Sequence, residues 1–176
     1  MSKIQEILQS KIKPGEKQTK IVKGVCQKKI SAKEFVEYFV SASDVDKGNC
    51  ADAMKHISAS NPEILAPHID TLLEYINYKL PRVKWGVPEA IGNMSKDYPE
   101  KASKAIPDLL KNTTDKKINT TVIKWCAAFA LAEIAKNNPK TRRQLLPIFE
   151  KIMRSEKNGG VKNVYVKALK AIEKEK

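Results

Sequence analysis

Apolar residues recur along the chain at the three- and four-residue spacing of an α-helix. Between residues 61 and 79 they stand at positions 64, 65, 69, 72, 73 and 76. Between residues 121 and 135 they stand at positions 122, 123, 126, 127, 130, 131 and 134. This spacing places them on one side of a helix, and no stretch alternates strictly over the length of a strand. The pattern therefore predicts an all-α protein.

The same spacing predicts about ten helices joined by short linkers. Ser31 with Glu34 forms a capping box ahead of Phe35 and marks the start of one helix. Asn158-Gly159 separates two helical patterns and is interpreted as a helix C-cap. Because the linkers are short, we expect a single domain over residues 1–176. The predicted helices cover 2–12, 16–28, 31–42, 46–60, 62–79, 82–97, 99–112, 116–137, 139–156 and 160–175.

A sequence motif repeats along the chain. The pattern [VI]-K-x5-A-[IL]-x-x-[IM] begins at Val83, Ile123 and Val161, and a more divergent copy begins at Asp46. The lysines of these copies, at positions 47, 84, 124 and 162, are 37, 40 and 38 residues apart. A proline follows each of the copies that begin at Asp46, Val83 and Ile123, at positions 62, 99 and 139 respectively. Proline suits the first turn of a helix, where its missing N–H is no loss. Each period therefore predicts a helix A that begins at the proline and a helix B that begins near the lysine.

This repeat resembles the HEAT repeats. The period near 40 residues, the helix-A proline and the Val-Lys opening of helix B carry the resemblance, and Asp115 matches an acidic turn residue of that family. Over residues 44–176 it implies a right-handed α-α superhelix, a solenoid of about four helical hairpins whose B helices line the concave face. Residues 1–43 are expected to be an N-terminal cap or a degenerate first repeat.

The charge of the chain is strongly positive and unevenly spread. The net charge is +13, of which residues 1–40 carry +5, residues 41–100 carry −3 and residues 101–176 carry +11. Such a chain attracts nucleic acid, acidic protein surfaces or anionic lipid. Lysine supplies most of this charge, and lysine attracts at long range without bidentate recognition.

Several classes of protein are disfavoured. No metal-ligand spacing, nucleotide-binding loop or nucleophile motif occurs, so we expect no metal and no cofactor. No apolar run approaches the roughly 20 residues that span a bilayer. Cys26, Cys50 and Cys126 are odd in number and widely spaced, and no secretory signal is recognised. We therefore expect free thiols in a reducing compartment and a cytoplasmic location. The chain is also expected to be a monomer.

The candidate binding lysines share one repeat position. Lys47, Lys84, Lys124 and Lys162 follow one another at the repeat period, and stacking would set them in a row. Such a row could follow a phosphate backbone loosely. Alternatively, each lysine could bond within its own repeat or with a neighbouring repeat.

Two aromatic residues and an arginine pair complete the candidate binding residues. Trp85 and Trp125 lie one repeat apart, and each follows one of the repeat lysines. They could stack on a base or grip a peptide, or pack half-buried between helices. Arg142 and Arg143 lie near the start of the last helix A, where they suit phosphate or carboxylate, or a solvated surface.

A second resemblance is to HEAT-like DNA alkylation repair glycosylases. Residues 129–139 are similar to their late repeat, and Trp85 with Glu89 is similar to their pair of a tryptophan and an acidic residue. The resemblance implies Glu89 as the one weak candidate for a catalytic residue. The chain departs from these enzymes at Phe129, where they favour tryptophan, and no arginine clearly fills their nucleotide-clamping position.

We therefore expect a non-catalytic scaffold that binds a protein partner on the concave face of a HEAT-like solenoid. Two alternatives are a basic solenoid that binds nucleic acid and a glycosylase-like enzyme. Binding through phosphates predicts an affinity that falls steeply with salt. Glycosylase activity predicts base release that is lost on Glu89→Gln.

Overall fold

The structure, a computed structural model, describes residues 1–115, 117 and 120–174. Within these ranges the chain forms helices and no β-strand, which confirms the predicted all-α fold. The elements are α1 (Lys3–Gln9), α2 (Pro14–Cys26), α3 (Ala32–Ser41), α4 (Asp44–Ser60), α5 (Pro62–Leu65), the 3₁₀ turn η1 (Ala66–His68), α6 (Ile69–Leu73), α7 (Pro81–Met94), α8 (Pro99–Ser103), α9 (Ile106–Thr114), α10 (Thr121–Asn137), α11 (Pro139–Ser155) and α12 (Gly159–Glu173).

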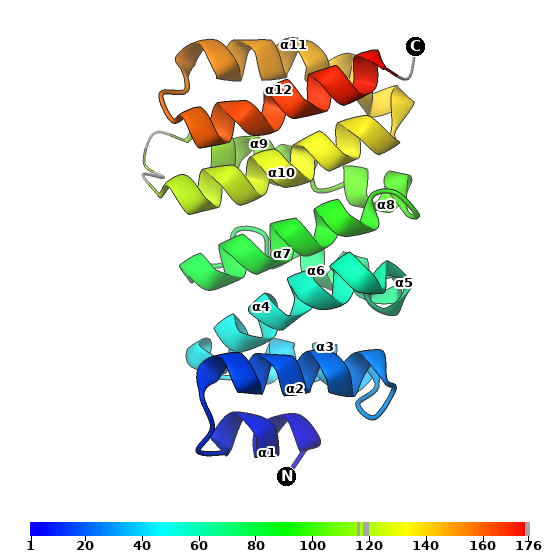
Figure 1. Cartoon of the computed structure of the whole chain (residues 1–176), viewed down its shortest axis with the longest axis vertical. Coiled ribbons are helices and arrows are strands. Elements are labelled where there is room, and N and C mark those ends of the chain that lie inside the picture. The colour runs from blue at the N-terminus through cyan, green and yellow to red at the C-terminus, as the bar shows by residue number, and fades with distance from the viewer. Residues whose placement is uncertain (116, 118–119, 175–176) are drawn as a thin grey trace.

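The B helices and α2 stack side by side in one layer (Figure 1). In Figure 1, α2, α4, α7, α10 and α12 lie in front, and α6 and α9 lie behind them. Within the front layer α4 packs along α7, α7 along α10, and α10 along α12. The N-terminus and the C-terminus lie at opposite ends of this stack. The result is a solenoid in which each helix pair is covered by the next.

The sequence repeat corresponds to these helix pairs. Pro62, Pro99 and Pro139 are the first residues of α5, α8 and α11, as the missing proline N–H predicts. The repeat lysines stand at the same place in the front helices, each three residues after the first residue of α4, α7, α10 or α12. The period of the sequence therefore sets where the B helices begin.

Two of the predicted A helices are broken. The helix expected over 62–79 divides into α5, η1 and α6 and ends at Leu73, and the helix expected over 99–112 divides into α8 and α9. Pro67 lies in η1 and Pro107 lies in the first turn of α9. Each break therefore lies next to an internal proline, which cannot donate the backbone hydrogen bond that a continuous helix requires.

The remaining boundaries agree closely, with one cap assigned to the wrong helix. Ser31 Oγ accepts a hydrogen bond from the Glu34 N–H at 3.0 Å, so Ser31 is the N-cap of α3 and supplies its half of the predicted capping box. Asn158 is an N-cap rather than a C-cap, because its Oδ1 accepts from the Val161 N–H at 3.1 Å and opens α12. The helix expected over 116–137 begins at Thr121. Positions 116, 118 and 119, and the predicted end at 175, lie outside the described residues.

One apolar core runs the length of the stack. It extends from Ile4 in α1 to Ile172 in α12, so the N-terminal helices share the core of the repeats. Small residues let the front helices approach closely: Gly86 of α7 faces the Ala51 carbonyl of α4. None of the helices that the structure describes combines the length and the apolar character needed to span a bilayer.

Candidate functional site

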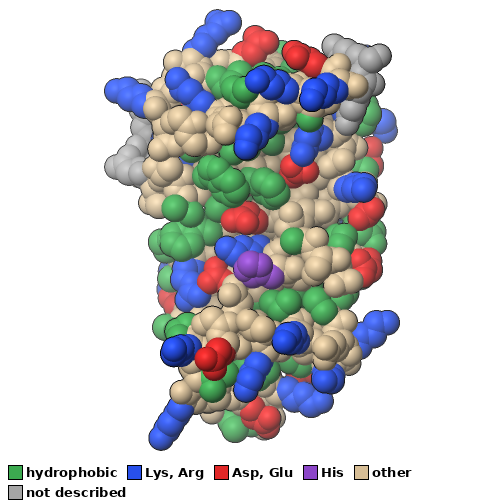
Figure 2. Space-filling model, in the orientation of Figure 1, with side chains coloured by type: hydrophobic (Ala, Val, Ile, Leu, Met, Phe, Trp, Pro, Cys, Tyr) green, Lys and Arg blue, Asp and Glu red, His purple; other side chains and the backbone are tan. Residues whose placement is uncertain are grey.

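The front helices present one continuous surface, which we call the B-helix face: the outward side of α4, α7, α10 and α12 (Figures 1 and 2). On α10 this side carries Trp125, Phe129, Glu133 and Lys136, all at least partly exposed, whereas the residues between them are largely buried. Their spacing of three and four residues aligns them on one side of the helix. In Figure 2 hydrophobic side chains gather over the middle of this face, and Lys and Arg side chains gather toward its two ends.

A groove of about 250 Å³ lies on this face between α10 and α12. The Trp125 side chain is 38% exposed, although it is one of the largest apolar groups of the chain. Its ring stacks on Phe129 with the ring centroids 5.7 Å apart and the planes at 7°. This pairing holds an apolar wall open to solvent, which is typical of a binding surface. The groove is lined by Trp125, Phe129, Ala132, Glu133, Lys136, Gly160, Asn163, Val164, Lys167 and Ala168.

Trp85 lines a different hollow, between the N-terminal ends of α4 and α7. This hollow of about 420 Å³ is mostly apolar, and Val45 at its edge is 71% exposed. Trp85 is half-buried, and its Nε1 is buried without a hydrogen-bond acceptor among the described residues. Trp85 and Trp125, which the sequence places one repeat apart, thus belong to two separate hollows along the same face.

Lys47 lies inside the fold, with 4% of its surface exposed. Its Nζ donates hydrogen bonds to the carbonyl oxygens of Phe39 at 2.7 Å and Val40 at 2.6 Å, in the last turn of α3. It also lies 5.5 to 5.6 Å from the centroids of the Phe39, Tyr75 and Tyr78 rings. Burial lowers the pKa of this ammonium group. Lys47 therefore completes the end of α3, and a ligand on the B-helix face does not reach it.

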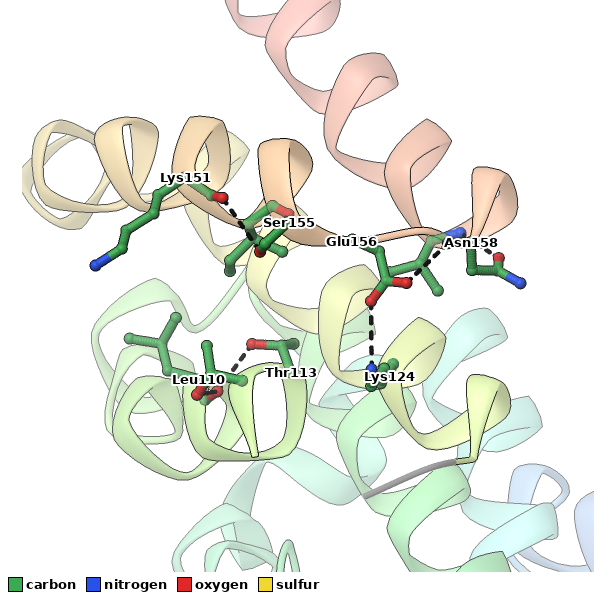
Figure 3. Close-up of polar contacts among 10 residues, drawn as sticks. Leu110, Thr113, Lys124, Lys151, Ser155, Glu156 and Asn158 are labelled. Atoms are coloured by element: carbon green, nitrogen blue, oxygen red, sulfur yellow. Dashed lines mark hydrogen bonds and ion pairs between the residues drawn. The ribbon is translucent and has the colours of Figure 1, made fainter. Parts of the chain in front are cut away.

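Lys124 faces the turn between α11 and α12 (Figure 3). Its Nζ lies 3.5 Å from Glu156 Oε2, and Glu156 Oε1 accepts a hydrogen bond from the Asn158 N–H at 2.8 Å. The lysine thus ties its own repeat to the next one. Lys84 and Lys162, at the equivalent position in α7 and α12, are half-buried. The structure does not bring the four repeat lysines together as one exposed row.

Replacing Glu156 with glutamine is expected to lower stability by about 1 kcal/mol at neutral pH. The Asn158 N–H is the main cause that holds the pKa of Glu156 below its usual value, and Lys124 adds to it. A carboxyl with a lowered pKa in the folded chain stabilises it above the unfolded pKa, and that contribution is lost as pH falls through the folded pKa. Urea unfolding should therefore show a difference between the two proteins that shrinks below about pH 4.5. Glu150→Gln, at an exposed position of α11, should show no such difference.

The two predicted arginines differ in role. Arg142 Nε donates to the Ala135 carbonyl oxygen at 2.8 Å, and its other nitrogen donates to the Lys136 carbonyl oxygen. It therefore closes the C-terminal end of α10, as Lys47 closes α3, and a cation there also suits the helix dipole. Arg143 is exposed on α11 and remains accessible to a partner.

The acidic groups of the B-helix face are engaged within the fold. Glu89 Oε1 accepts a hydrogen bond from the buried Cys126 thiol at 3.1 Å. Burial, followed by the charge of Glu89, raises the pKa of this thiol well above its usual range. Glu133 pairs with Lys136 at 2.5 Å. These contacts account for the position of Glu89 without a catalytic step. Among the described residues, no group of His, Cys, Asp and Glu side chains is arranged to hold a metal ion.

Sequence reasoning passed over part of the groove. Lys167 and Gly160 of α12 line it, and neither was singled out. A signal was present, because Lys167 stands at the same repeat position as Phe129 and Glu89. Extending the repeat alignment by one helical turn would have placed all three on the B-helix face.

The stacked helix pairs and the sequence repeat define an α-helical-repeat solenoid. A computationally designed armadillo repeat protein for modular peptide recognition is similar, with 23% identity, a TM-score of 0.66, and coverage of 89% of this chain and 68% of the other. A designed armadillo repeat protein in complex with the peptide (KR)4 has 16% identity and a TM-score of 0.53, with 96% and 98% of the two chains covered. An engineered protein has 17% identity and a TM-score of 0.68, over 81% of this chain.

The chain spans 62% of the length of that engineered protein and 37% of another. No model of a known protein family matches the sequence, and the search of curated proteins gives no match. These comparisons support the helical-repeat fold and do not show the resemblance to DNA glycosylases.

Proposed function

We propose that this chain is a non-catalytic scaffold that binds a segment of a partner protein along the B-helix face. The observation that carries the proposal is the groove between α10 and α12, where Trp125 stacks on Phe129 and stays 38% exposed. Fully burying such an aromatic ring in an interface supplies much of the binding energy of a protein complex. The three cysteines are free, which is compatible with a reducing compartment such as the cytoplasm.

The shape of the site favours a peptide segment. The groove runs between two neighbouring helices, and the second apolar hollow at Trp85 lies farther along the same face. An extended segment could occupy both hollows at once. Two structures of the same fold support this proposal, since one was designed for modular peptide recognition and another was solved with a peptide.

A nucleic acid fits the face less well. Lys47 is buried and Lys124 is paired with Glu156, so the predicted row of lysines does not line the groove. The face offers aromatic and aliphatic side chains at its centre instead. Binding to phosphates would require cations set along it at regular spacing.

Selection from a random 12-residue peptide library tests the proposal. Peptides enriched on the full chain should bind Trp125→Ala at least tenfold more weakly, because that change removes the apolar wall of the groove. Val122→Ala is a matched control, since Val122 is 44% exposed on the same helix and does not line the groove. Fluorescence anisotropy of the enriched peptides gives the affinities. Enrichment that ignores Trp125, or no enrichment, would refute the proposed function.

A further inference from the structure

We propose that the bound segment is acidic and carries one bulky apolar residue, which occupies the groove between α10 and α12 while neighbouring carboxylates face Lys167. This inference rests on the proposed function and adds the chemistry of the partner. The groove has two unlike walls: α10 supplies the aromatic residues Trp125 and Phe129, and α12 supplies the cationic residue Lys167. One wall selects an apolar side chain and the other selects negative charge.

The charges of the groove are not balanced within the chain. Lys136 is paired with Glu133 at 2.5 Å, so these two groups largely neutralise each other. Lys167 has no ion-pair partner in the part of the chain that the structure describes. The same holds for Lys162 and Lys170 on the same helix, and the only acidic residue within α12 is Glu173 at its last position. Lys162 and Lys170 do not line the groove, so Lys167 is the cation that α12 contributes to its lining, without a carboxylate partner among the described residues.

The rest of the face offers little to a basic ligand. Asp52 of α4 accepts from Arg82 Nε at 3.2 Å, and Glu89 of α7 accepts from the Cys126 thiol at 3.1 Å. With Glu133 paired as well, each of these carboxylates already has a partner from the chain. Asp52 and Glu133 are paired with cations of the chain, which weakens their attraction for a lysine or arginine of a ligand. The preferred charge is thus opposite to that of the (KR)4 peptide bound by the designed protein of similar fold.

Synthetic 12-residue peptides test the charge and the apolar residue separately. The first alternates Asp and Glu with a central Leu, the second replaces every acid by Lys or Arg, and the third replaces the Leu by Ala. By fluorescence anisotropy on the full chain, the first should bind at least tenfold more tightly than either of the others. Its affinity should fall with rising salt, because the attraction is electrostatic.

Two charge reversals separate local recognition from general attraction to a basic protein. Lys167→Glu should weaken the acidic peptide at least tenfold. Lys151→Glu, which makes the same change at an exposed position of α11 outside the groove, should weaken it less than twofold. Equal losses in both variants would overturn the inference, since they would show attraction by net charge alone.

The outcomes distinguish this inference from the proposed function. If library peptides depend on Trp125 but are neutral or basic, the acidic partner is wrong and the peptide-binding scaffold stands. If no peptide depends on Trp125, both fail. A 12-nucleotide single-stranded DNA that binds more tightly than the acidic peptide, and loses affinity on Trp125→Ala, would make nucleic acid the ligand and overturn the inference.

Discussion

Replacing Gly86 with alanine is expected to destabilise the fold by about 3 kcal/mol. A Cβ at this position in α7 would lie 2.2 Å from the carbonyl oxygen of Ala51 in α4 and 2.5 Å from its carbonyl carbon. Both are backbone atoms, so no side chain can turn away, and α4 must move apart from α7. These two helices join the N-terminal and C-terminal parts of the stack. Urea unfolding followed by circular dichroism should show a lower midpoint.

Gly15→Ala is the matched control for this change. Gly15 is the second residue of α2, and apart from its chain neighbours and the backbone of its own helix nothing lies within 4 Å of an added Cβ. Alanine is favoured over glycine in a helix by roughly 0.5–1 kcal/mol, so this variant should be as stable as the wild type or slightly more stable. If Gly86→Ala unfolded at the wild-type midpoint, the close approach of α4 and α7 would be wrong.

The start of each B helix could be predicted because it is a local property that the sequence repeats. The repeat lysine stands three residues into α4, α7, α10 and α12 alike, and the buried positions follow from the same period. The boundaries of the A helices are harder to predict from the sequence. Pro107 and Pro147 each follow a helix-opening proline by eight residues, yet α9 begins beside Pro107 whereas α11 continues through Pro147. The local signal is the same in both, so it cannot decide which proline interrupts a helix.

The residues of the candidate site could also be predicted only in part, because the sequence does not show which cations are available to a ligand. A positively charged residue in a sequence indicates attraction to anionic or polar groups. The sequence does not say whether those groups belong to a ligand or to the chain itself. Lys47 and Arg142 both donate to carbonyl oxygens at the end of a preceding helix, and Lys124 meets Glu156. The last four carbonyls of a helix lack partners within it, so long cationic side chains can complete them. Only the tertiary arrangement distinguishes these three cations from Lys167, which lines the groove.

Replacing Lys47 with methionine is expected to lower stability by about 3 kcal/mol. Methionine keeps much of the volume but donates no hydrogen bond, so the Phe39 and Val40 carbonyl groups lose the donor that now lies 2.7 and 2.6 Å away. The attraction between the ammonium group and the three surrounding rings is lost as well. Burial of the ammonium charge is unfavourable and lowers the pKa of Lys47. The net loss of stability is therefore smaller than the sum of the contacts that Lys47 makes.

Lys162→Met tests whether this effect belongs to the repeat position or to the contacts of Lys47. Lys162 stands at the same position of α12 and is half-buried, but no side-chain partner is found for it among the described residues. Its replacement should change the urea midpoint by less than the equivalent of about 0.5 kcal/mol. Faster amide exchange near the end of α3 should accompany Lys47→Met only, because that helix alone loses its closing donor. Equal losses of stability in the two variants would contradict this explanation. They would mean that the repeat lysines stabilise the solenoid through a shared role and not through the capping of α3 by Lys47.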